Sequence, residues 1–232
     1  MLNRPSFLAP ERRIRIGRSG ESRPVTAGRS RVFLTSGSTR VPMSIVQAVG
    51  FDLLVSGTAD WYSGQRVKVG LISSIPMVEL KIPGRVHWQE QKHSEAEFGI
   101  VLDDSLPEEF VVREPGCERS SLRFSTHIDG TLHWLEPHAV SSSAIVVNYS
   151  RQGVCLKSSA APKIGTEMRF AWKKDGVETS ITGVTRWMIG QDVGSLTGVE
   201  LTNALGYAIA GVTVNPARTS LLSPQRCFRE TQ

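Results

Sequence analysis

The sequence predicts an all-β fold, arranged as two small sandwich or barrel units in tandem with a short linker and little helix. Short segments rich in β-branched residues follow one another along the chain, separated by Gly, Pro, Ser or Asp about every 8 to 12 residues, a spacing typical of a small sandwich or barrel. The chain also repeats itself. GRVHW at 84–88 and FGIVL at 98–102 recur as GVTRW at 183–187 and TGVEL at 197–201, each 99 residues later. Because two repeats are too few for a solenoid, the repeat indicates two homologous domains.

The first unit is expected to span residues 31–102. Within it, VELKI at 78–82 alternates apolar and polar residues strictly, as a strand with one face on a core must. Five further segments are short and bounded by turn-forming residues: SRVFLTS at 30–36, VPMSIVQAV at 41–49, FDLLVS at 51–56, RVKVGLIS at 66–73 and EFGIVL at 97–102. These six segments supply the strands of the first barrel.

The second unit is expected to span residues 119–205 and supplies similar segments in the same order. These are AIVVNYS at 144–150, GVCLKSS at 153–159, EMRFAWKK at 167–174, ETSITGVTRWMI at 178–189 and LTGVEL at 196–201. Between the units, DDSLPEEFVVREPGCE at 103–118 is polar and contains two prolines, which indicates a linker. In the C-terminal tail, residues 206–232, the stretch around GYAIAG predicts a short helical turn.

The composition is that of an ordinary soluble globular protein, since 40% of the residues are hydrophobic and 21% are charged. The charge is uneven, because residues 1–40 hold nine arginines against two glutamates. Such a segment could meet nucleic acid, an anionic membrane or an acidic partner, but a solvated arm over residues 1–30 is the simpler interpretation. We therefore expect a basic, poorly ordered N-terminal arm.

The three cysteines, Cys117, Cys155 and Cys227, are an odd number at spacings that fit neither a disulfide framework nor a zinc knuckle. We interpret them as free thiols in a reducing compartment. The chain has no apolar run near the roughly 20 residues needed to cross a bilayer, and no apolar segment of a signal peptide follows the first Met. These features predict a cytoplasmic protein without a membrane span.

Two short motifs carry the chemistry. In NYSRQG, Asn148 and Ser150 lie two residues apart at the end of a predicted strand, so an amide and a hydroxyl project from one face. Gly153 then lets the chain turn with a positive φ. In RSSLR, which ends 25 residues before Asn148, Arg119 and Arg123 offer two planar guanidinium forks that match phosphate oxygens or the O6/N7 edge of guanine. The combination predicts a site for an anionic guanine nucleotide.

At these motifs the chain resembles the PilZ domains, bacterial receptors for cyclic di-GMP. ERSSLRF, NYSRQG, GVTRW and GVEL stand in the order of the family pattern, over residues 118–201. The resemblance implies two tandem small six-stranded PilZ-like β-barrels, and in the second of them Arg119 and Arg123 clamp the phosphates and guanines. It further implies that Asn148 and Ser150 hydrogen-bond a guanine and that Gly153 permits the turn. Arg151, at a variable position of the motif, is a further candidate for a phosphate contact.

The first unit resembles the same family in its strands but not in its site. Aligned by eye, Ile45 and Gln47 stand in register with Asn148 and Ser150, and Gly50 with Gly153. Ile45 can donate no hydrogen bond to a base. We therefore expect a degenerate barrel that keeps the fold and lacks the ligand groups, followed by a binding one, as in flagellar-brake proteins of this family.

Other chemistries fit less well. His127, His133 and His138 are spaced by six and five residues, which suits neither a helix face nor a strand face, and SSSA at 141–144 lacks the context of a nucleophile elbow. Trp88 and Trp187, at matching places in the repeat, are expected to pack in the core or at the barrel rim.

Two functional hypotheses remain. The first is a cyclic di-GMP receptor of bacterial second-messenger signalling, not an enzyme and without a cofactor or metal, in which ligand binding reorients the two barrels or a partner surface. The resemblance implies a protein partner such as motility or polysaccharide machinery, and no nucleic acid. The alternative is a PilZ-like module that binds protein, or nucleic acid through its basic arm, and no longer binds the dinucleotide.

Overall fold

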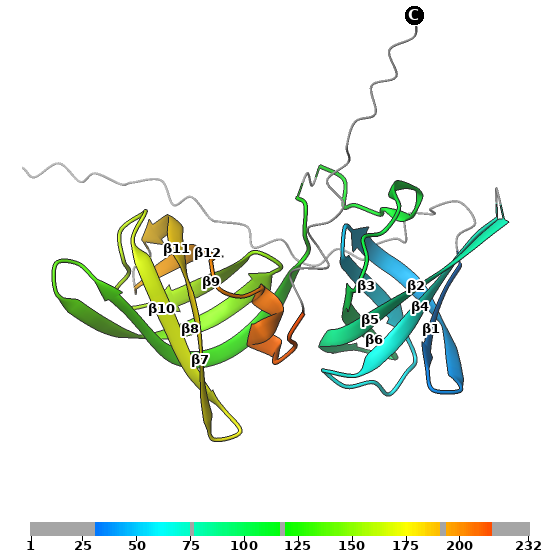
Figure 1. Cartoon of the computed structure of the whole chain (residues 1–232), viewed down its shortest axis with the longest axis horizontal. Coiled ribbons are helices and arrows are strands. Elements are labelled where there is room, and N and C mark those ends of the chain that lie inside the picture. The colour runs from blue at the N-terminus through cyan, green and yellow to red at the C-terminus, as the bar shows by residue number, and fades with distance from the viewer. Residues whose placement is uncertain (1–30, 75–76, 117–118, 191–193, 215–232) are drawn as a thin grey trace, which may run out of the picture.

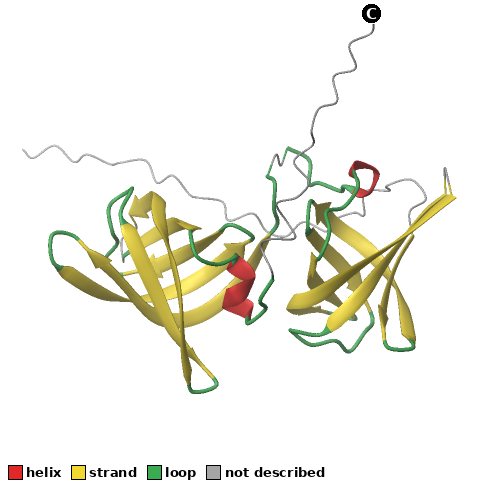
Figure 2. Cartoon of the chain, in the orientation of Figure 1, coloured by secondary structure: helices red, strands yellow, loops and turns green. Residues whose placement is uncertain are grey.

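The computed structural model describes residues 31–74, 77–116, 119–190 and 194–214. It confirms the all-β prediction: the chain forms two closed six-stranded barrels that lie side by side along the long axis of the molecule (Figure 1). Helical structure in the described residues is limited to two 3₁₀ turns, η1 at Glu108–Phe110 and η2 at Gly206–Ala210 (Figure 2). The predicted N-terminal arm and the end of the C-terminal tail lie outside the described residues, as do Cys117 and Cys227.

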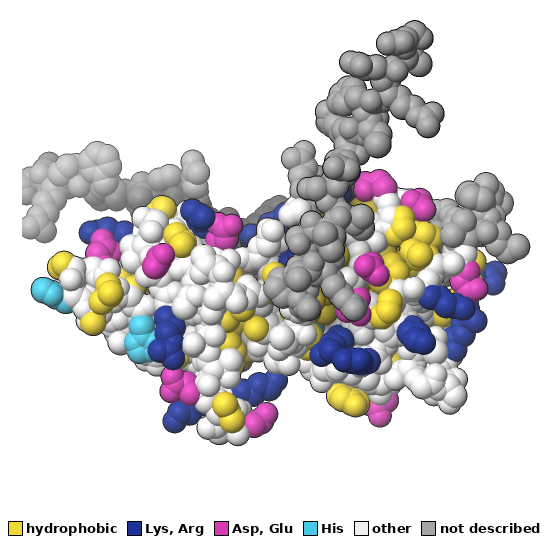
Figure 3. Space-filling view, in the orientation of Figure 1, with side chains coloured by type: hydrophobic (Ala, Val, Ile, Leu, Met, Phe, Trp, Pro, Cys, Tyr) yellow, Lys and Arg dark blue, Asp and Glu magenta, His cyan; other side chains and the backbone are white. Residues whose placement is uncertain are grey.

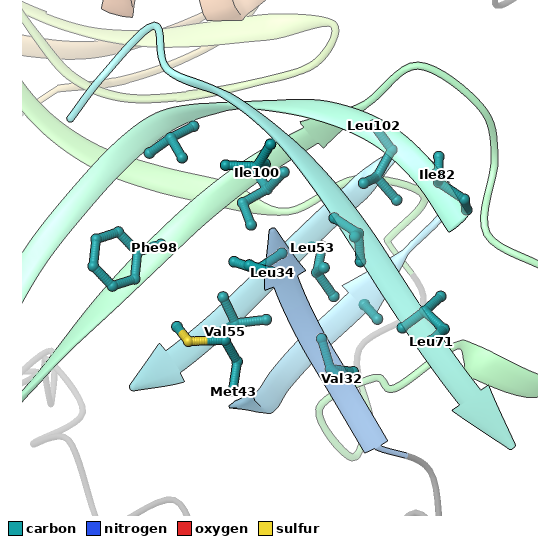
Figure 4. Close-up of a cluster of buried hydrophobic side chains, with 14 of the residues drawn as sticks. Val32, Leu34, Met43, Leu53, Val55, Leu71, Ile82, Phe98, Ile100 and Leu102 are labelled. Carbon is teal, nitrogen blue, oxygen red and sulfur yellow. The ribbon is translucent and has the colours of Figure 1, made fainter. Parts of the chain in front are cut away.

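The first barrel contains the six predicted strands. They are β1 (Arg31–Ser36), β2 (Thr39–Val49), β3 (Asp52–Gly57), β4 (Arg66–Ser74), β5 (Met77–Lys92) and β6 (Glu95–Leu102), closed in the order β1-β2-β3-β6-β5-β4 with antiparallel pairing throughout. Alternate residues point inward and fill the barrel with aliphatic and aromatic side chains, among them Leu34, Leu53 and Phe98 (Figure 4). The period-2 pattern of the sequence thus decides which residues form the core.

The second barrel has the same topology. Its strands are β7 (Arg123–Leu135), β8 (Ala139–Ser150), β9 (Gly153–Ser158), β10 (Glu167–Lys174), β11 (Val177–Gly190) and β12 (Ser195–Leu201), in the closed order β10-β11-β12-β9-β8-β7. Strand β7 lies outside the segments that the sequence pattern singles out. Its residues, RFSTHIDGTLHWL, include many polar side chains and an interior glycine, so its strand character comes from pairing with β8 and β10 rather than from its own sequence.

Matching β-bulges fix the correspondence between the barrels. Register shifts fall between Ile45 and Gln47 in β2 and between Val146 and Asn148 in β8. After its bulge Gln47 pairs with Leu54, as Asn148 pairs with Cys155. The alignment by eye is therefore wrong by two residues.

In the corrected register Gln47 corresponds to Asn148, and Val49 to Ser150. Asp52 pairs with Val101 as Gly153 pairs with Glu200, so Asp52 takes the place of Gly153. Of the two polar groups at the end of β8, the first barrel keeps an amide but has no hydroxyl.

The segment that follows each barrel closes one of its ends. After β6, Leu106, Phe110 and Val112 join the first core, and the backbone of Val112 exchanges two hydrogen bonds with Ala48. After β12, Tyr207, Ile209 and Val212 join the second core. Part of the predicted linker, 103–118, is therefore packed structure.

No helix of the described residues is long and apolar enough to cross a membrane.

The two barrels share a packed interface. Val49 and Val101, both on the outside of the first barrel, are 4% and 2% exposed and belong to the same buried cluster as Leu122, Phe124 and Tyr149 of the second unit. In Figure 1 the η2 turn lies between the barrels, and the Tyr207 hydroxyl at its start donates a hydrogen bond to Asp52. The interface is thus both apolar and hydrogen-bonded.

His87 is buried in this interface. Its Nδ1 lies 2.9 Å from the Tyr149 hydroxyl, and that hydroxyl lies 3.2 Å from the His87 carbonyl oxygen. A proton on Nδ1 satisfies both contacts, because the ring then donates to the hydroxyl and the hydroxyl donates to the carbonyl. Burial lowers the pKa of His87 to about 3, so the ring is neutral at physiological pH.

Candidate functional site

One pocket of the second barrel brings together the residues that the motifs singled out. It has a volume of about 330 Å³, and we call it the arginine pocket. Its lining includes Arg119, Arg123, Asn148, Ser150 and Gly153, which come from two segments of the chain. The remaining lining residues are Ser120, Ser121, Gln152, Val154, Cys155, Arg186, Trp187, Gly198, Val199 and Glu200.

Strand pairing positions the two motifs against each other. Arg123 is the first residue of β7 and pairs with Ser150, the last residue of β8, while Ser125 pairs with Asn148. Because side chains two apart on a strand share a face, Asn148 and Ser150 point to the same side as Arg123. Arg119 lies in the segment just before β7 and is exposed, so its guanidinium is accessible.

Gly153 does not act as the sequence predicts. It is absent from the glycines with positive φ among the described residues, and it begins strand β9. A Cβ at this position would lie 2.7 Å from the Val199 carbonyl oxygen of the neighbouring strand. Glycine is thus required here for the close approach of two strands, not for a turn.

Arg151 is not brought to the arginine pocket. Its guanidinium carbon lies 4.0 Å from the centroid of the Phe51 ring of the first barrel, a cation–π contact across the interface. Residues 150 and 151 are neighbours near a strand end, so their side chains point in different directions. Ser150 lines the pocket and Arg151 faces the first barrel.

The pocket also contains charged residues that the motif analysis does not single out. Arg186 occupies the bulge of β11, and its Nε lies 2.5 Å from Oε2 of Glu200. Three arginines therefore line the pocket against one carboxylate, which is already paired with one of them. Arg186 lies in the GVTRW piece of the repeat and Glu200 in the GVEL piece. The repeat is therefore the sequence signal that could have pointed to these two residues.

Trp187 forms a wall of the pocket. A Cβ on Gly198 would lie 2.0 Å from the indole ring of Trp187, so this glycine leaves the space that the ring occupies. Trp187 is half-buried and thus belongs to the rim, as expected for this position of the repeat. The adjoining Cys155 is buried, and burial raises the pKa of its thiol while the nearby charge of Arg123 acts in the opposite direction.

Two of the three histidines of the second barrel contact other side chains. No group of three or more metal-ligating side chains occurs in the described part of the chain. His127 lies 3.8 Å from the exposed Asp129 carboxylate, and His133 lies 2.9 Å from the Ser141 hydroxyl. The arginine pocket instead offers guanidinium, amide and hydroxyl groups, which suit an anion that carries a planar, hydrogen-bonding ring.

No family model and no curated protein matches the chain. Among solved structures, it is similar to the inhibitor of motility MotI (DgrA) of Bacillus subtilis, at 12% identity and a TM-score of 0.32 over 80% of this chain and 91% of that one. It is also similar to PlzA of Borreliella burgdorferi in complex with c-di-GMP, at 11% identity and a TM-score of 0.34 over 82% and 84% of the two chains. A third is YcgR of Escherichia coli in complex with c-di-GMP, at 9% identity and a TM-score of 0.31 over 75% and 76%. Such distant likeness leaves the ligand to be inferred from the pocket itself.

Proposed function

We propose that this chain is a receptor for cyclic di-GMP, which it binds in the arginine pocket without turning it over. The observation that supports this most strongly is the convergence of two separate motifs. Arg119 and Arg123 come from the segment before and at the start of β7, Asn148 and Ser150 come from the end of β8, and all four line one pocket. Their common pocket supports a single ligand site that uses both motifs.

The pocket chemistry suits each part of this ligand. A cyclic dinucleotide carries two phosphodiesters and two guanines, and the planar guanidinium fork can pair with phosphate oxygens or with the O6/N7 edge of guanine. The half-buried Asn148 amide both donates and accepts hydrogen bonds, and the Ser150 hydroxyl adds another donor. The arginines supply charge and the strand end supplies base recognition.

The output of binding is proposed to be a change in the relative placement of the barrels or in the surface offered to a protein partner, such as motility or polysaccharide machinery. The pocket adjoins the interface through residues 119–124 and 150–152, so a ligand there lies close to both barrels. A ligand shifts such an equilibrium only through its differential affinity for the two arrangements.

Calorimetric titration of the full chain with cyclic di-GMP, with GMP and GTP as controls, tests the proposal. We expect saturable binding of the dinucleotide in the micromolar range or tighter, and at least about tenfold weaker binding after Arg119→Ala or Arg123→Ala. Arg169→Ala is the matched control, because Arg169 is an exposed arginine of the same barrel that pairs with Glu178 at 3.1 Å outside the pocket. Equal losses in all three variants would indicate diffuse electrostatic attraction, and no binding at all would favour a protein-interaction module.

A further inference from the structure

The β2–β3 turn of the first barrel, defined as residues 50–52 to include the first residue of β3, contacts the arginine segment of the second barrel, residues 119–123. Oδ2 of Asp52 accepts a hydrogen bond of 2.9 Å from the backbone N–H of Leu122, and its Oδ1 accepts one from the Tyr207 hydroxyl. Asp52 and Leu122 are 1% and 8% exposed, so this contact is shielded from water. Leu122 directly precedes Arg123, so the turn fixes the backbone next to a ligand-binding residue.

Residues 121–124 alternate between two surfaces. Ser121 and Arg123 line the arginine pocket, whereas Leu122 and Phe124 are buried against the first barrel. The Phe124 ring lies 4.4 Å from the His87 ring, centroid to centroid. It also packs on Gly99, where an added Cβ would lie 2.5 Å from the Phe124 ring. The backbone is therefore held on both sides of Arg123.

Contacts continue on either side of this stretch. The Trp88 indole donates a hydrogen bond of 2.8 Å to the Ser125 carbonyl oxygen. The turn also reaches the second motif, because Phe51 lies under the guanidinium of Arg151, the neighbour of Ser150. One turn of the first barrel thus contacts both segments that carry the ligand motifs, residues 119–123 and 148–153.

We propose that this turn, and Asp52 above all, is a positioning element for the ligand site of the second barrel, an inference that rests on the proposed function. Arginine side chains and the segment that carries them lose conformational freedom when a ligand is bound, which costs binding free energy. A segment that is already fixed by Asp52 has less freedom to lose. The first barrel then contributes to affinity without contacting the ligand.

The position of this turn in the repeat supports the inference. Gly50, Phe51 and Asp52 correspond to Arg151, Gln152 and Gly153, the end of the ligand motif in the second barrel. Six further residues of the first barrel at this interface also correspond to residues of the arginine pocket: Val49 to Ser150, Leu54 to Cys155, His87 to Arg186, Trp88 to Trp187, Gly99 to Gly198 and Val101 to Glu200. The face of the first barrel that lacks ligand groups thus packs against the second barrel and supports the face that carries them.

Titration of the full chain with cyclic di-GMP, combined with amide exchange of the ligand-free protein, tests this role. Asp52→Ala removes the acceptor for the Leu122 N–H and is expected to weaken binding about tenfold and to speed amide exchange at residues 122–124. Asp52→Asn should stay within about threefold of the wild type, because its amide oxygen can still accept from Leu122 and its NH₂ can donate to Tyr207. Asp60→Ala, at an exposed aspartate of the same barrel, is the control and should change neither measurement.

A double variant separates a purely structural role of Asp52 from a positioning role. If Asp52 acts through the arginine segment, Asp52→Ala in an Arg123→Ala chain should weaken binding by about threefold or less, not by a further tenfold. If Asp52→Ala does not fold, Phe51→Leu serves instead, since it keeps an apolar contact but loses the ring beneath Arg151, and we expect about threefold weaker binding.

The outcomes separate the two proposals. No binding by the wild-type chain overturns the proposed function and this inference with it. Normal binding by the wild type together with unchanged affinity in folded Asp52→Ala or Phe51→Leu overturns only the positioning role, as does a full additional tenfold loss in the Arg123→Ala background. Equal losses in Asp52→Ala and Asp52→Asn overturn the hydrogen bond to Leu122 as its basis.

Discussion

In the second barrel, Asn148 and Ser150 end strand β8 and open into the arginine pocket; in the first barrel, Gln47 and Val49 hold the same positions, and Val49 is buried against the second unit. The strand pairing is the same in both, including a bulge at the same place. A few side-chain differences therefore decide whether this face of the barrel opens into a pocket or packs against protein. How few of them are needed can be tested.

The largest effect is expected when the second barrel receives the residues of the first. Asn148→Gln with Ser150→Val keeps an amide but lengthens it and removes the hydroxyl. Because each lost polar contact to a base is worth about 1–3 kcal/mol, we expect roughly a hundredfold loss of affinity for cyclic di-GMP in the titration. Circular dichroism should show an unchanged β-barrel, since Gln and Val already occupy this backbone in the first unit. Affinity within about threefold of the wild type would mean that Asn148 and Ser150 do not contact the ligand.

A smaller effect is expected from the strand approach at Gly153. Gly153→Ala puts a Cβ 2.7 Å from the Val199 carbonyl oxygen, and we expect a loss of about 1–2 kcal/mol in the free energy of unfolding measured with urea. Gly190→Ala is the matched control, because no atom lies within 4 Å of the Cβ that it would add at the end of β11. Equal stability of the two variants would show that β9 and β12 can separate without cost.

The smallest effect is expected from a change of pH on the wild-type chain, because the contributions of His87 and Asp52 to stability oppose each other. The pKa of His87 is lowered to about 3, so its contribution to stability is lost as the pH falls below 6.5. Burial raises the pKa of Asp52 to about 6, against the hydrogen bonds from Tyr207 and Leu122 and the charge of Arg151. Its ionisation is therefore unfavourable in the folded state, and its contribution is lost as the pH rises from 3.8 through 6.

Between pH 7 and 4 these contributions nearly cancel, and the wild-type free energy of unfolding should change by about 1 kcal/mol or less from this pair. Asp52→Asn removes the pH-dependent contribution of Asp52 to stability and leaves that of His87. Its urea-unfolding free energy should then fall by about 2–3 kcal/mol over the same pH range, owing to His87 alone. A flat profile in Asp52→Asn would mean that His87 is not buried as a neutral ring.

The sequence predicts the fold well because local pattern and pairing agree. Six short segments bounded by turn residues account for the first barrel, and only β7, with its polar residues and interior glycine, needs its neighbours to be recognised as a strand. The common face of Asn148 and Ser150 could also be foreseen, since residues two apart on a strand share a face. That Arg119 and Arg123 line the same pocket is implied only by the family resemblance.

The role of Gly153 and the register of the first barrel could not be foreseen. The bulges lie at the same place in both barrels and do not shift one repeat against the other. The alignment by eye matches Gly50 with Gly153, whereas strand pairing puts Asp52 in the place of Gly153, and this is why it sets Ile45 rather than Gln47 opposite Asn148. The interface between the two barrels could not be predicted from the sequence either. Gly50 and Asp52 are common turn residues, and nothing in their local pattern distinguishes a solvated turn from one that accepts a hydrogen bond from Leu122 of another unit.

The docking of the first barrel has a consequence for how such chains can grow. The first barrel presents its pocket-equivalent face, around Gly99 and Asp52, to Phe124, Tyr149 and Tyr207 of the second, whereas the described residues of the second barrel leave that face open. A further barrel docked in the same way onto the second would cover the arginine pocket and leave its own equivalent face open. Lengthening the array would therefore add mass and surface, while the number of open pockets of this kind would stay at one.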